Sequence, residues 1–212
     1  MGNHLWGGDF IMVSKSYWEH RKYHRGEDNC RKLLYRWIEP GDSVLDVGCG
    51  SGWMYENFKR EKIPIKYKGV DLTKNFIEGA KIDFPEAEFE VQDARTLKER
   101  DRSFDVVTLY HVLEHLPRLG WREAIQEALR VTRKLVVVTI WRGLAEESSN
   151  HTLPGYQDIE GYDYLEERMA NYIGRTEFFG FLERLGFDDV PHFRCSDGIN
   201  PTDIFLLWLK QG

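Results

Sequence analysis

Cysteine is scarce in this sequence, and long apolar runs are missing. The 212 residues include only three cysteines, Cys30, Cys49 and Cys195. An odd, widely spaced set does not suit a disulfide framework or a structural zinc site, and a reducing cytoplasm is its simplest compartment. No segment approaches the roughly 20 apolar residues that cross a bilayer, and Met1 to Asp9 lacks the order of a secretory signal. We therefore predict a soluble, cytoplasmic protein without a membrane span.

Positive charge is also limited. The sequence has 29 basic and 35 acidic residues, which gives a formal net charge of -6 at pH 7. A surface that binds nucleic acid needs the opposite sign, because it neutralises phosphates. The basic stretch from His20 to Arg25 is flanked by Glu19, Glu27 and Asp28, and we interpret it as a solvent-exposed helix. The charge balance therefore disfavours nucleic acid as a partner.

Segments with strand and helix patterns alternate along the middle of the chain. The predicted strands are 43–47, 67–71, 88–91, 104–109 and 135–141. The predicted helices are 28–38, 53–60, 75–82 and 121–132. Helices that connect consecutive strands at this spacing produce right-handed crossovers and a parallel sheet covered on both faces. The fold class is therefore predicted to be α/β, a three-layer sandwich.

The last third of the sequence has a different pattern. Residues 142–172 are polar, rich in Tyr, Gly and Glu, and without a clean period, so we predict an insertion over the open end of the sheet. A helix is expected at 177–185, with Thr176 as its N-cap and Gly186 as its C-terminal stop. Two final strands, 189–193 and 204–209, are predicted to pair as an antiparallel hairpin. Because no linker or repeat divides the chain, one domain over 1–212 is expected.

Three glycines follow the first predicted strand at alternating positions, Gly48, Gly50 and Gly52. Glycine allows a sharp turn and lets a ligand touch the backbone, and ligands of open α/β sheets bind beyond the carboxyl ends of the strands. The spacing differs from a dinucleotide fingerprint, because Trp53 stands where the third glycine would fall, and no P-loop lysine follows. The charge of Asp46 would repel a pyrophosphate and attract a cationic amino group.

An acidic residue ends the next predicted strand. Asp71 lies 71 - 52 = 19 residues beyond Gly52, close to the spacing at which a carboxylate accepts hydrogen bonds from the hydroxyls of a bound ribose. The alternative role for Asp71 is to cap the following helix, a role that Thr73 could fill instead. Together with the glycine turn, Asp71 predicts a nucleoside ligand without phosphates.

Four segments in this order resemble the class I S-adenosylmethionine-dependent methyltransferases. They are Val44 to Gly52, Gly69 to Leu72, Gln92 to Ala94 and Phe104 to Leu116. The resemblance implies a Rossmann-like, seven-stranded, mostly parallel sheet with an antiparallel C-terminal hairpin. It also implies an enzyme that uses S-adenosylmethionine as its cofactor and releases S-adenosylhomocysteine. A segment at 1–27 is expected to act as an N-terminal lid.

The same resemblance implies which residues bind the cofactor. Asp71 would hold the ribose, Leu72 would pack on the adenine face, and Asp93 would meet the adenine edge with Ala94. Asp46 and the glycine turn would border the amino-acid part, and Tyr110 would approach the methionine moiety. The full predicted set is Asp46, Gly48, Cys49, Gly50, Gly52, Asp71, Leu72, Asp93, Ala94 and Tyr110.

The acceptor of the methyl group is expected to be a small molecule, because the net charge is acidic and the insertion contains several aromatic residues. If the acceptor is a hydroxyl, a general base helps, and imidazole titrates near neutrality. His111, just after the fourth strand, is the first candidate, and His151 in the insertion is the second. An amine or thiol acceptor needs no such base, and the sequence leaves these alternatives open. It also does not decide whether the protein is a monomer or a homodimer.

Residues 111–115 also match H-x-x-E-H, the inverted zinc-peptidase motif. A zinc site needs a helix that holds both histidines on one face, whereas here the motif begins at a strand end and Pro117 follows closely. We therefore expect no metal. Tyr156, Tyr162 and Tyr164 of the insertion would either line the pocket or pack within a long loop.

Two other classes compete with the methyltransferase interpretation. One is a non-catalytic cofactor-binding or protein-interaction module, in which the insertion docks a partner. The other is a nicotinamide-dependent oxidoreductase, which the glycine spacing disfavours.

Overall fold

The computed structural model describes residues 33–116, 119–141, 143–152, 169–196 and 201–210. Its main feature is a seven-stranded sheet in the order β3-β2-β1-β4-β5-β9-β8. The strands are β1 (Ser43–Val47), β2 (Lys66–Asp71), β3 (Glu88–Val91), β4 (Phe104–Tyr110), β5 (Thr132–Trp141), β8 (His192–Ser196) and β9 (Pro201–Trp208). The first five are parallel, and β9 runs antiparallel to both β5 and β8. The Rossmann-like α/β prediction with an antiparallel C-terminal hairpin is confirmed.

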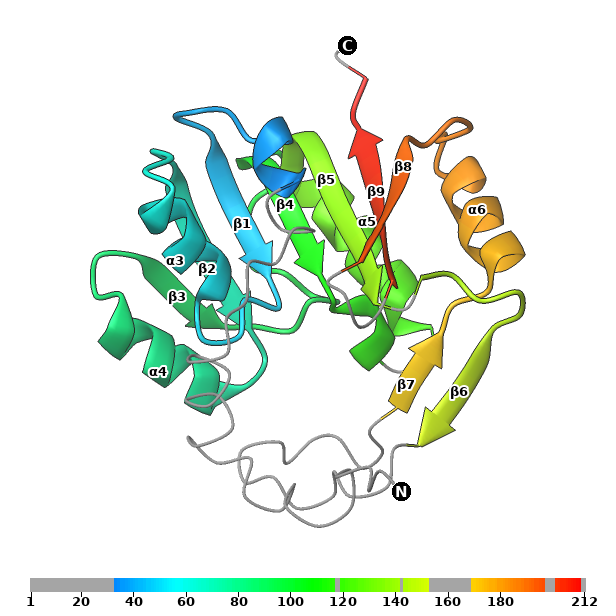
Figure 1. Cartoon of the computed structure of the whole chain (residues 1–212), viewed down its shortest axis with the longest axis horizontal. Helices are drawn as coiled ribbons and strands as arrows, with labels where there is room; N and C mark the ends of the chain where they lie inside the picture. Colours follow the sequence, from blue (N-terminus) through cyan, green and yellow to red (C-terminus); the bar gives the residue numbers. More distant parts are fainter. Residues whose placement is uncertain (1–32, 117–118, 142, 153–168, 197–200, 211–212) are drawn as a thin grey trace.

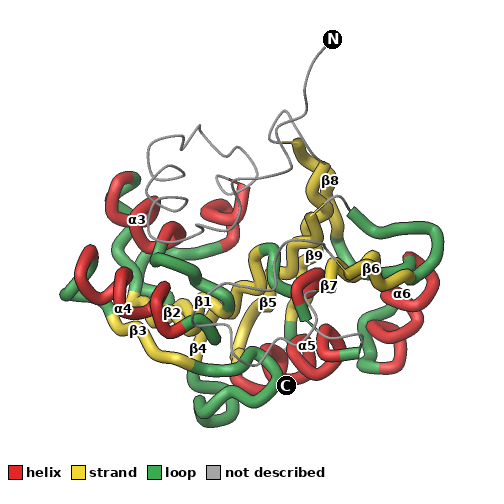
Figure 2. Tube along the Cα trace, turned by 90° about the horizontal axis from the view of Figure 1, so that it is seen from below, coloured by secondary structure: helices red, strands yellow, loops and turns green. Residues whose placement is uncertain are grey.

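Helices cover both faces of this sheet (Figures 1 and 2). On one face, α3 (Trp53–Arg60), α4 (Lys74–Asp83) and the short 3-10 helix η2 (Tyr35–Trp37) contribute to one buried apolar cluster. On the other face, α5 (Gly120–Val131) and α6 (Arg175–Arg184) contribute to a second. The strands β1 and β4 are buried on both faces, which explains why their sequences are largely apolar.

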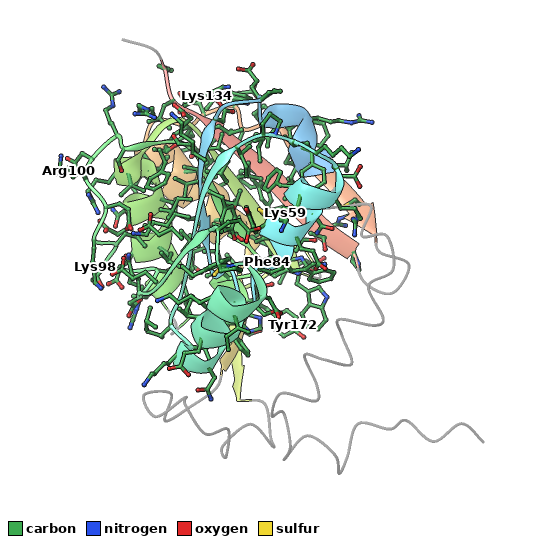
Figure 3. All side chains as sticks on the ribbon, turned by 90° about the vertical axis from the view of Figure 1, so that its left-hand side faces the viewer. Lys59, Phe84, Lys98, Arg100, Lys134 and Tyr172 are labelled. Atoms are coloured by element: carbon green, nitrogen blue, oxygen red, sulfur yellow. The ribbon has the colours of Figure 1, made fainter. Side chains whose placement is uncertain are left out.

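The helices α3 and α4 are joined at the surface by a cation. The ammonium of Lys59 lies 5.6 Å from the ring centroid of Phe84, directly after α4, and forms an ion pair with Glu86 (Figure 3). Because the charged groups of Lys59 and Glu86 are exposed, this ion pair adds little to stability. It links the carboxyl-terminal ends of α3 and α4.

Most predicted boundaries agree with the structure within a few residues. The strand at Ser43–Val47 and the helix at Trp53–Arg60 were predicted to the residue. The predicted N-cap at Thr176 is wrong, because α6 begins at Arg175 and Gly174 occupies the cap position. The predicted strand 189–193 is displaced, since β8 starts at His192.

The insertion contains regular structure that its sequence pattern did not predict. Two strands, β6 (Ser149–Thr152) and β7 (Met169–Tyr172), pair antiparallel as a separate ribbon. The ribbon lies below the carboxyl ends of β4 and β5 in Figure 1, and β7 packs against the 3-10 helix η3 (Leu113–His115) that follows β4. The described part of the insertion therefore lies at the end of the sheet where the insertion was expected.

The two cysteines in the described part of the chain differ. Cys49 is a free, buried thiol, whereas Cys195 in β8 is disulfide-bonded. One disulfide is not a framework of several, and the expected reducing compartment stays a prediction. Among the described residues, no helix is long and apolar enough to cross a membrane.

Candidate active site

The glycine turn folds back onto the neighbouring strand. The backbone N–H groups of Gly48 and Cys49 both donate to the carbonyl of Val70 in β2, at 2.7 and 3.0 Å. All three glycines have left-handed backbone angles, with φ of 76° at Gly48, 54° at Gly50 and 81° at Gly52. Side chains other than glycine adopt such angles only at a cost. The predicted sharp turn is therefore present at the carboxyl end of β1.

The three glycines differ in what surrounds them. A Cβ on Gly48 would lie 2.3 Å from Cγ2 of Val112, and a Cβ on Gly52 would lie 2.9 Å from Cζ of Phe89. A Cβ on Gly50 would meet no atom within 4 Å. Packing thus requires glycine at the two outer positions, while the middle one faces open space in which a ligand could contact the backbone.

Asp71 lies beside this open space. Its Oδ2 accepts a hydrogen bond from the N–H of Gly50 at 2.9 Å, and its Oδ1 accepts one from the N–H of Thr73 at 2.8 Å. Burial raises the pKa of the carboxyl, and these backbone donors oppose that effect. Thr73 precedes the first residue of α4, so Asp71 organises the loop rather than capping the helix. The side chain of Thr73 and the backbone of Leu72 also donate to this carboxylate, so a ribose hydroxyl would share it with several donors.

Asp46 lies beneath the turn, within the sheet. Its side chain is buried, with Oδ2 accepting from the hydroxyl of Tyr67 at 2.7 Å and Oδ1 from that of Thr108 at 2.9 Å. These donors belong to β2 and β4, the strands on either side of β1. Sequence reasoning missed both hydroxyls. They stabilise a buried negative charge below the site where the cofactor's amino group was predicted to bind.

The predicted adenine-edge residues follow β3. Arg95 binds the carboxylate of Asp93 twice. Its Nη2 lies 2.6 Å from Oδ2 of Asp93, and its backbone N–H donates to Oδ1 of Asp93 at 2.8 Å. Burial alone would raise the pKa of Asp93, but the hydrogen bonds from Arg95 lower it. Ala94 is buried, whereas the apolar side chain of Leu72 is only half-buried. Sequence reasoning did not find Arg95.

His111 lies at the carboxyl end of β4 in a strained conformation. Its φ of 55° is in the left-handed region, which is uncommon for residues other than glycine. The backbone N–H donates to Oγ1 of Thr139 in β5 at 2.9 Å, and the ring Nε2 lies 3.3 Å from Oγ1 of Thr202 in β9. The imidazole also contacts the ring of Tyr110, with centroids 4.3 Å apart. Non-glycine residues held in this way cluster at functional sites.

Glu114 is a buried carboxylate close to His111 in sequence. Its Oε1 accepts the backbone N–H of Trp141 at 3.1 Å, while its Oε2 has no hydrogen-bond partner among the described residues. Burial raises the pKa of Glu114 from its usual 4.5 to about 7. This carboxyl group holds the end of β5, where the insertion begins, against η3.

The H-x-x-E-H sequence does not form a metal site within the described residues. Leu113–His115 is a three-residue 3-10 helix, so the α-helix of a zinc peptidase is not formed there. His115 is exposed, while Glu114 is buried against Trp141. No group of three or more metal-binding side chains occurs in the part of the chain that the structure describes.

The predicted site residues gather at one edge of the sheet. They follow β1, β2, β3 and β4 at their carboxyl ends (Figure 1), which is where an open α/β sheet binds ligands. The backbone of His151 belongs to β6, but its side chain lies outside the described residues. So do the predicted lid at 1–27 and the insertion residues Tyr156, Tyr162 and Tyr164.

Comparison with known proteins agrees with this geometry. A family model described as "Methyltransferase domain" matches residues 44–134. The chain is 21% identical to a ubiquinone/menaquinone biosynthesis C-methyltransferase of Campylobacter jejuni, over 81% of each protein. It is 30% identical to a ubiquinone biosynthesis O-methyltransferase of Ralstonia nicotianae, over 51% of this chain and 49% of that protein.

Solved structures share the fold. A S-adenosylmethionine-dependent methyltransferase of Methanosarcina mazei has a TM-score of 0.63 at 17% identity, covering 83% of this chain and 96% of that one. Magnesium protoporphyrin IX methyltransferase of Synechocystis with bound S-adenosylhomocysteine has a TM-score of 0.62 at 17% identity, covering 99% and 90%.

The fold, the glycine turn and these relatives together define the class of protein. The chain contains a methyltransferase domain over residues 44–134 and is similar in sequence and fold to the class I S-adenosylmethionine-dependent methyltransferases. It is therefore an enzyme whose cofactor is S-adenosylmethionine.

Proposed function

We propose that this methyltransferase methylates a hydroxyl group of a small aromatic molecule, with His111 as the general base. The observation that carries the proposal is the position of His111 at the carboxyl end of β4, where its backbone N–H donates to Oγ1 of Thr139 and its ring Nε2 lies 3.3 Å from Oγ1 of Thr202. The aromatic rings of Tyr110 and Trp141 lie at the ends of the same two strands. Of the relatives named for ubiquinone biosynthesis, one is a C-methyltransferase and the other an O-methyltransferase, and only the second name supports a hydroxyl acceptor.

The cofactor site is proposed to use the residues predicted from the sequence. Bound S-adenosylmethionine supplies a methyl group on a positively charged sulfur. Asp71 accepts the ribose hydroxyls, Leu72 covers the adenine face, and Asp93 with Ala94 borders its edge. Backbone groups of the glycine turn contact the amino-acid part, whose ammonium is attracted by the charge of Asp46. These residues are Gly48, Cys49, Gly50 and Gly52.

In the proposed reaction, the acceptor oxygen attacks the methyl carbon in line with the carbon–sulfur bond. That bond breaks, its electron pair stays on sulfur, and the hydroxyl proton moves to the imidazole of His111. The chain therefore contributes orientation and a proton acceptor, and orientation alone can account for much of the rate. His151 is the second candidate for the base, because β6 belongs to the ribbon beside η3.

Binding measurements test the cofactor assignment first. Calorimetric titration with S-adenosylhomocysteine should give saturable binding, and titration with NAD should give none. Binding of NAD alone would overturn the assignment.

Turnover measurements test the acceptor and the base. The full chain would be incubated with S-adenosylmethionine and a panel of phenols, catechols, amines and thiols, and formation of S-adenosylhomocysteine would be followed. His111→Gln should lower kcat for a phenolic acceptor by about 100-fold or more, without changing the Kd for S-adenosylhomocysteine. His192→Gln, an exposed histidine of β8, is the matched control.

Two outcomes would contradict the proposal. An unchanged kcat in His111→Gln would remove that residue from the reaction. Tight binding of S-adenosylhomocysteine without transfer to any acceptor would favour a non-catalytic module.

A further inference from the structure

Two neighbouring residues at the amino end of β9 contact different parts of the candidate site. Oγ1 of Thr202 lies 3.3 Å from Nε2 of His111. Successive side chains of a strand point to opposite faces of the sheet, and Oδ2 of Asp203 accepts the backbone N–H of Leu144 at 2.9 Å. Leu144 lies just beyond the end of β5, where the insertion starts. The strand β9 therefore touches both the candidate base and the beginning of the insertion.

The carboxylate of Asp203 is also bound by Arg194 of β8. Nε of Arg194 lies 2.6 Å from Oδ1 of Asp203, and Nη2 lies 2.9 Å from Oδ2. Such a bidentate pair fixes the orientation of both groups. Burial alone would raise the pKa of Asp203, but the hydrogen bonds from Arg194 and Leu144 lower it. A buried, charged carboxylate thus anchors the chain that leaves β5.

Gly143 packs directly against this ion pair. A Cβ on Gly143 would lie 2.7 Å from both Nη2 of Arg194 and Oδ2 of Asp203. The backbone N–H of Gly143 donates to the carbonyl of Ile140 at 3.1 Å, and its φ of 77° is left-handed. Glycine allows both the turn and the close approach. The path of the chain into the insertion is therefore fixed by contacts with β8 and β9.

The two arms of the insertion meet in a neck, which we define as residues 143–148 and 173–175. The N–H of Ala145 donates to the carbonyl of Ile173 at 3.0 Å, and the N–H of Arg175 donates to the carbonyl of Ala145 at 2.8 Å. These hydrogen bonds join the outgoing arm to the returning arm. A contact that fixes one arm of the neck therefore also fixes the other.

The neck is bound to the helices as well. Oγ of Ser148 accepts the N–H of Gly174 at 2.7 Å and donates to Glu177 of α6, which pairs with Arg122 of α5. Beyond the neck the two arms become β6 and β7, and β7 packs against η3. The contacts of the neck thus set the position of the ribbon beside the candidate site.

We propose that Asp203 and Arg194 are positioning residues of the methyl-acceptor site, which fix the neck so that the ribbon lies beside η3 before the acceptor binds. The inference rests on the proposed function, in which the acceptor lies at His111, directly before η3. A preformed wall binds a ligand without the cost of ordering it. Loosening the neck should therefore weaken acceptor binding. Cofactor binding should be unchanged, because the strands that carry the glycine turn and Asp71, β1 and β2, are separated from β9 by β4 and β5.

The test removes the ion pair from the surface side. Arg194→Ala should fold, because the side chain of Arg194 is 54% exposed, and Arg194→Lys keeps a positive charge beside Asp203. Arg133→Ala is the matched control, since it removes a similarly exposed ion pair, with Asp105, at the opposite end of β5. Asp203→Asn is a second variant that removes the charge and keeps the shape of the side chain.

Two measurements separate positioning from folding. Hydrogen exchange of the full chain bound to S-adenosylhomocysteine reports the protection of the N–H of Leu144 and of the neck without requiring an acceptor. In Arg194→Ala and Asp203→Asn this exchange should be about tenfold faster, and the KM for a phenolic acceptor should rise about tenfold. The Kd for S-adenosylhomocysteine should not change. Arg194→Lys should recover most of both effects, and Arg133→Ala should match wild type.

Failure of this inference differs from failure of the proposed function. Wild-type exchange in Arg194→Ala and Asp203→Asn, or faster exchange with an unchanged KM, would overturn the positioning role and leave His111 in place. An equal loss of S-adenosylhomocysteine binding would also overturn it, because the ion pair would then support the whole fold. An active His111→Gln would overturn the proposed base, while hydrogen exchange would still decide whether Arg194 fixes the neck.

Discussion

The carboxylate of Asp71 accepts the backbone N–H of Gly50 at 2.9 Å, which ties the end of β2 to the middle of the glycine turn. One side chain therefore both shapes the turn and offers lone pairs to a ribose.

We predict that Asp71→Asn weakens binding of S-adenosylhomocysteine by about 10- to 100-fold, the loss expected for hydrogen bonds to a charged group. The amide keeps one acceptor oxygen but places its NH2 donor against one of the two backbone N–H groups, that of Gly50 or that of Thr73. Calorimetry measures the change. Asp188→Asn, at an exposed position, is the control, and wild-type affinity in Asp71→Asn would exclude the ribose role.

The glycines of the turn should respond differently to substitution. Gly50→Ala should lower the free energy of unfolding by only about 1–2 kcal/mol, the cost of a left-handed alanine, because no atom lies within 4 Å of its Cβ. The same Cβ should weaken cofactor binding by more than about tenfold. Thermal unfolding and calorimetry together measure both effects.

Gly48→Ala should behave in the opposite way. Its Cβ would lie 2.3 Å from Cγ2 of Val112, so the fold itself should lose stability. Adding Val112→Ala removes the clashing methyl groups and should recover part of the loss. A Tm for Gly48→Ala equal to that of Gly50→Ala would contradict this account of the turn.

Stability should depend on pH through Glu114. Burial raises its pKa to about 7 in the folded chain, while the unfolded value is near 4.5, so the folded state binds more protons between these two values. Stability from this group is therefore full below about pH 4.5 and is lost as pH rises through 7, by about 3 kcal/mol at 1.36 kcal/mol per pH unit.

Glu114→Gln should remove this dependence while keeping an acceptor for the N–H of Trp141. The measurement is Tm against pH for both proteins, with Glu123→Gln as an exposed control on α5. Parallel curves for wild type and Glu114→Gln between pH 5 and 8 would refute the prediction.

The buried charge of Asp46 should make its two hydroxyl donors important for stability. Thr108→Val leaves Oδ1 of Asp46 without its hydroxyl partner, and we expect a loss of about 1–3 kcal/mol in the free energy of unfolding. Tyr67→Phe should cost a similar amount, since it removes the donor to Oδ2. Denaturant unfolding measures both, with the exposed Thr96→Val as the control. Wild-type stability in both variants would show that Asp46 does not depend on these donors.

Local sequence determined the elements and the ligand class. Local patterns predicted the strand at Ser43–Val47, the helix at Trp53–Arg60 and the turn between them. The spacing of apolar residues and the backbone freedom of glycine are both visible within a few residues of sequence. The acidic residue at the end of β2 was found by the same kind of spacing. These signals predict the cofactor site without any knowledge of long-range contacts.

Tertiary structure decided which side chains meet. Thr108 is 62 residues from Asp46, and Thr202 is 91 residues from His111. Such pairs depend on strand order and register, which no local period encodes. The same holds for Glu114 at the backbone of Trp141 and for the N-cap of α6 at Gly174. The sequence determined the glycine turn and the acidic residue of the proposed cofactor site, and only the packing of the sheet brought together the side chains that surround them.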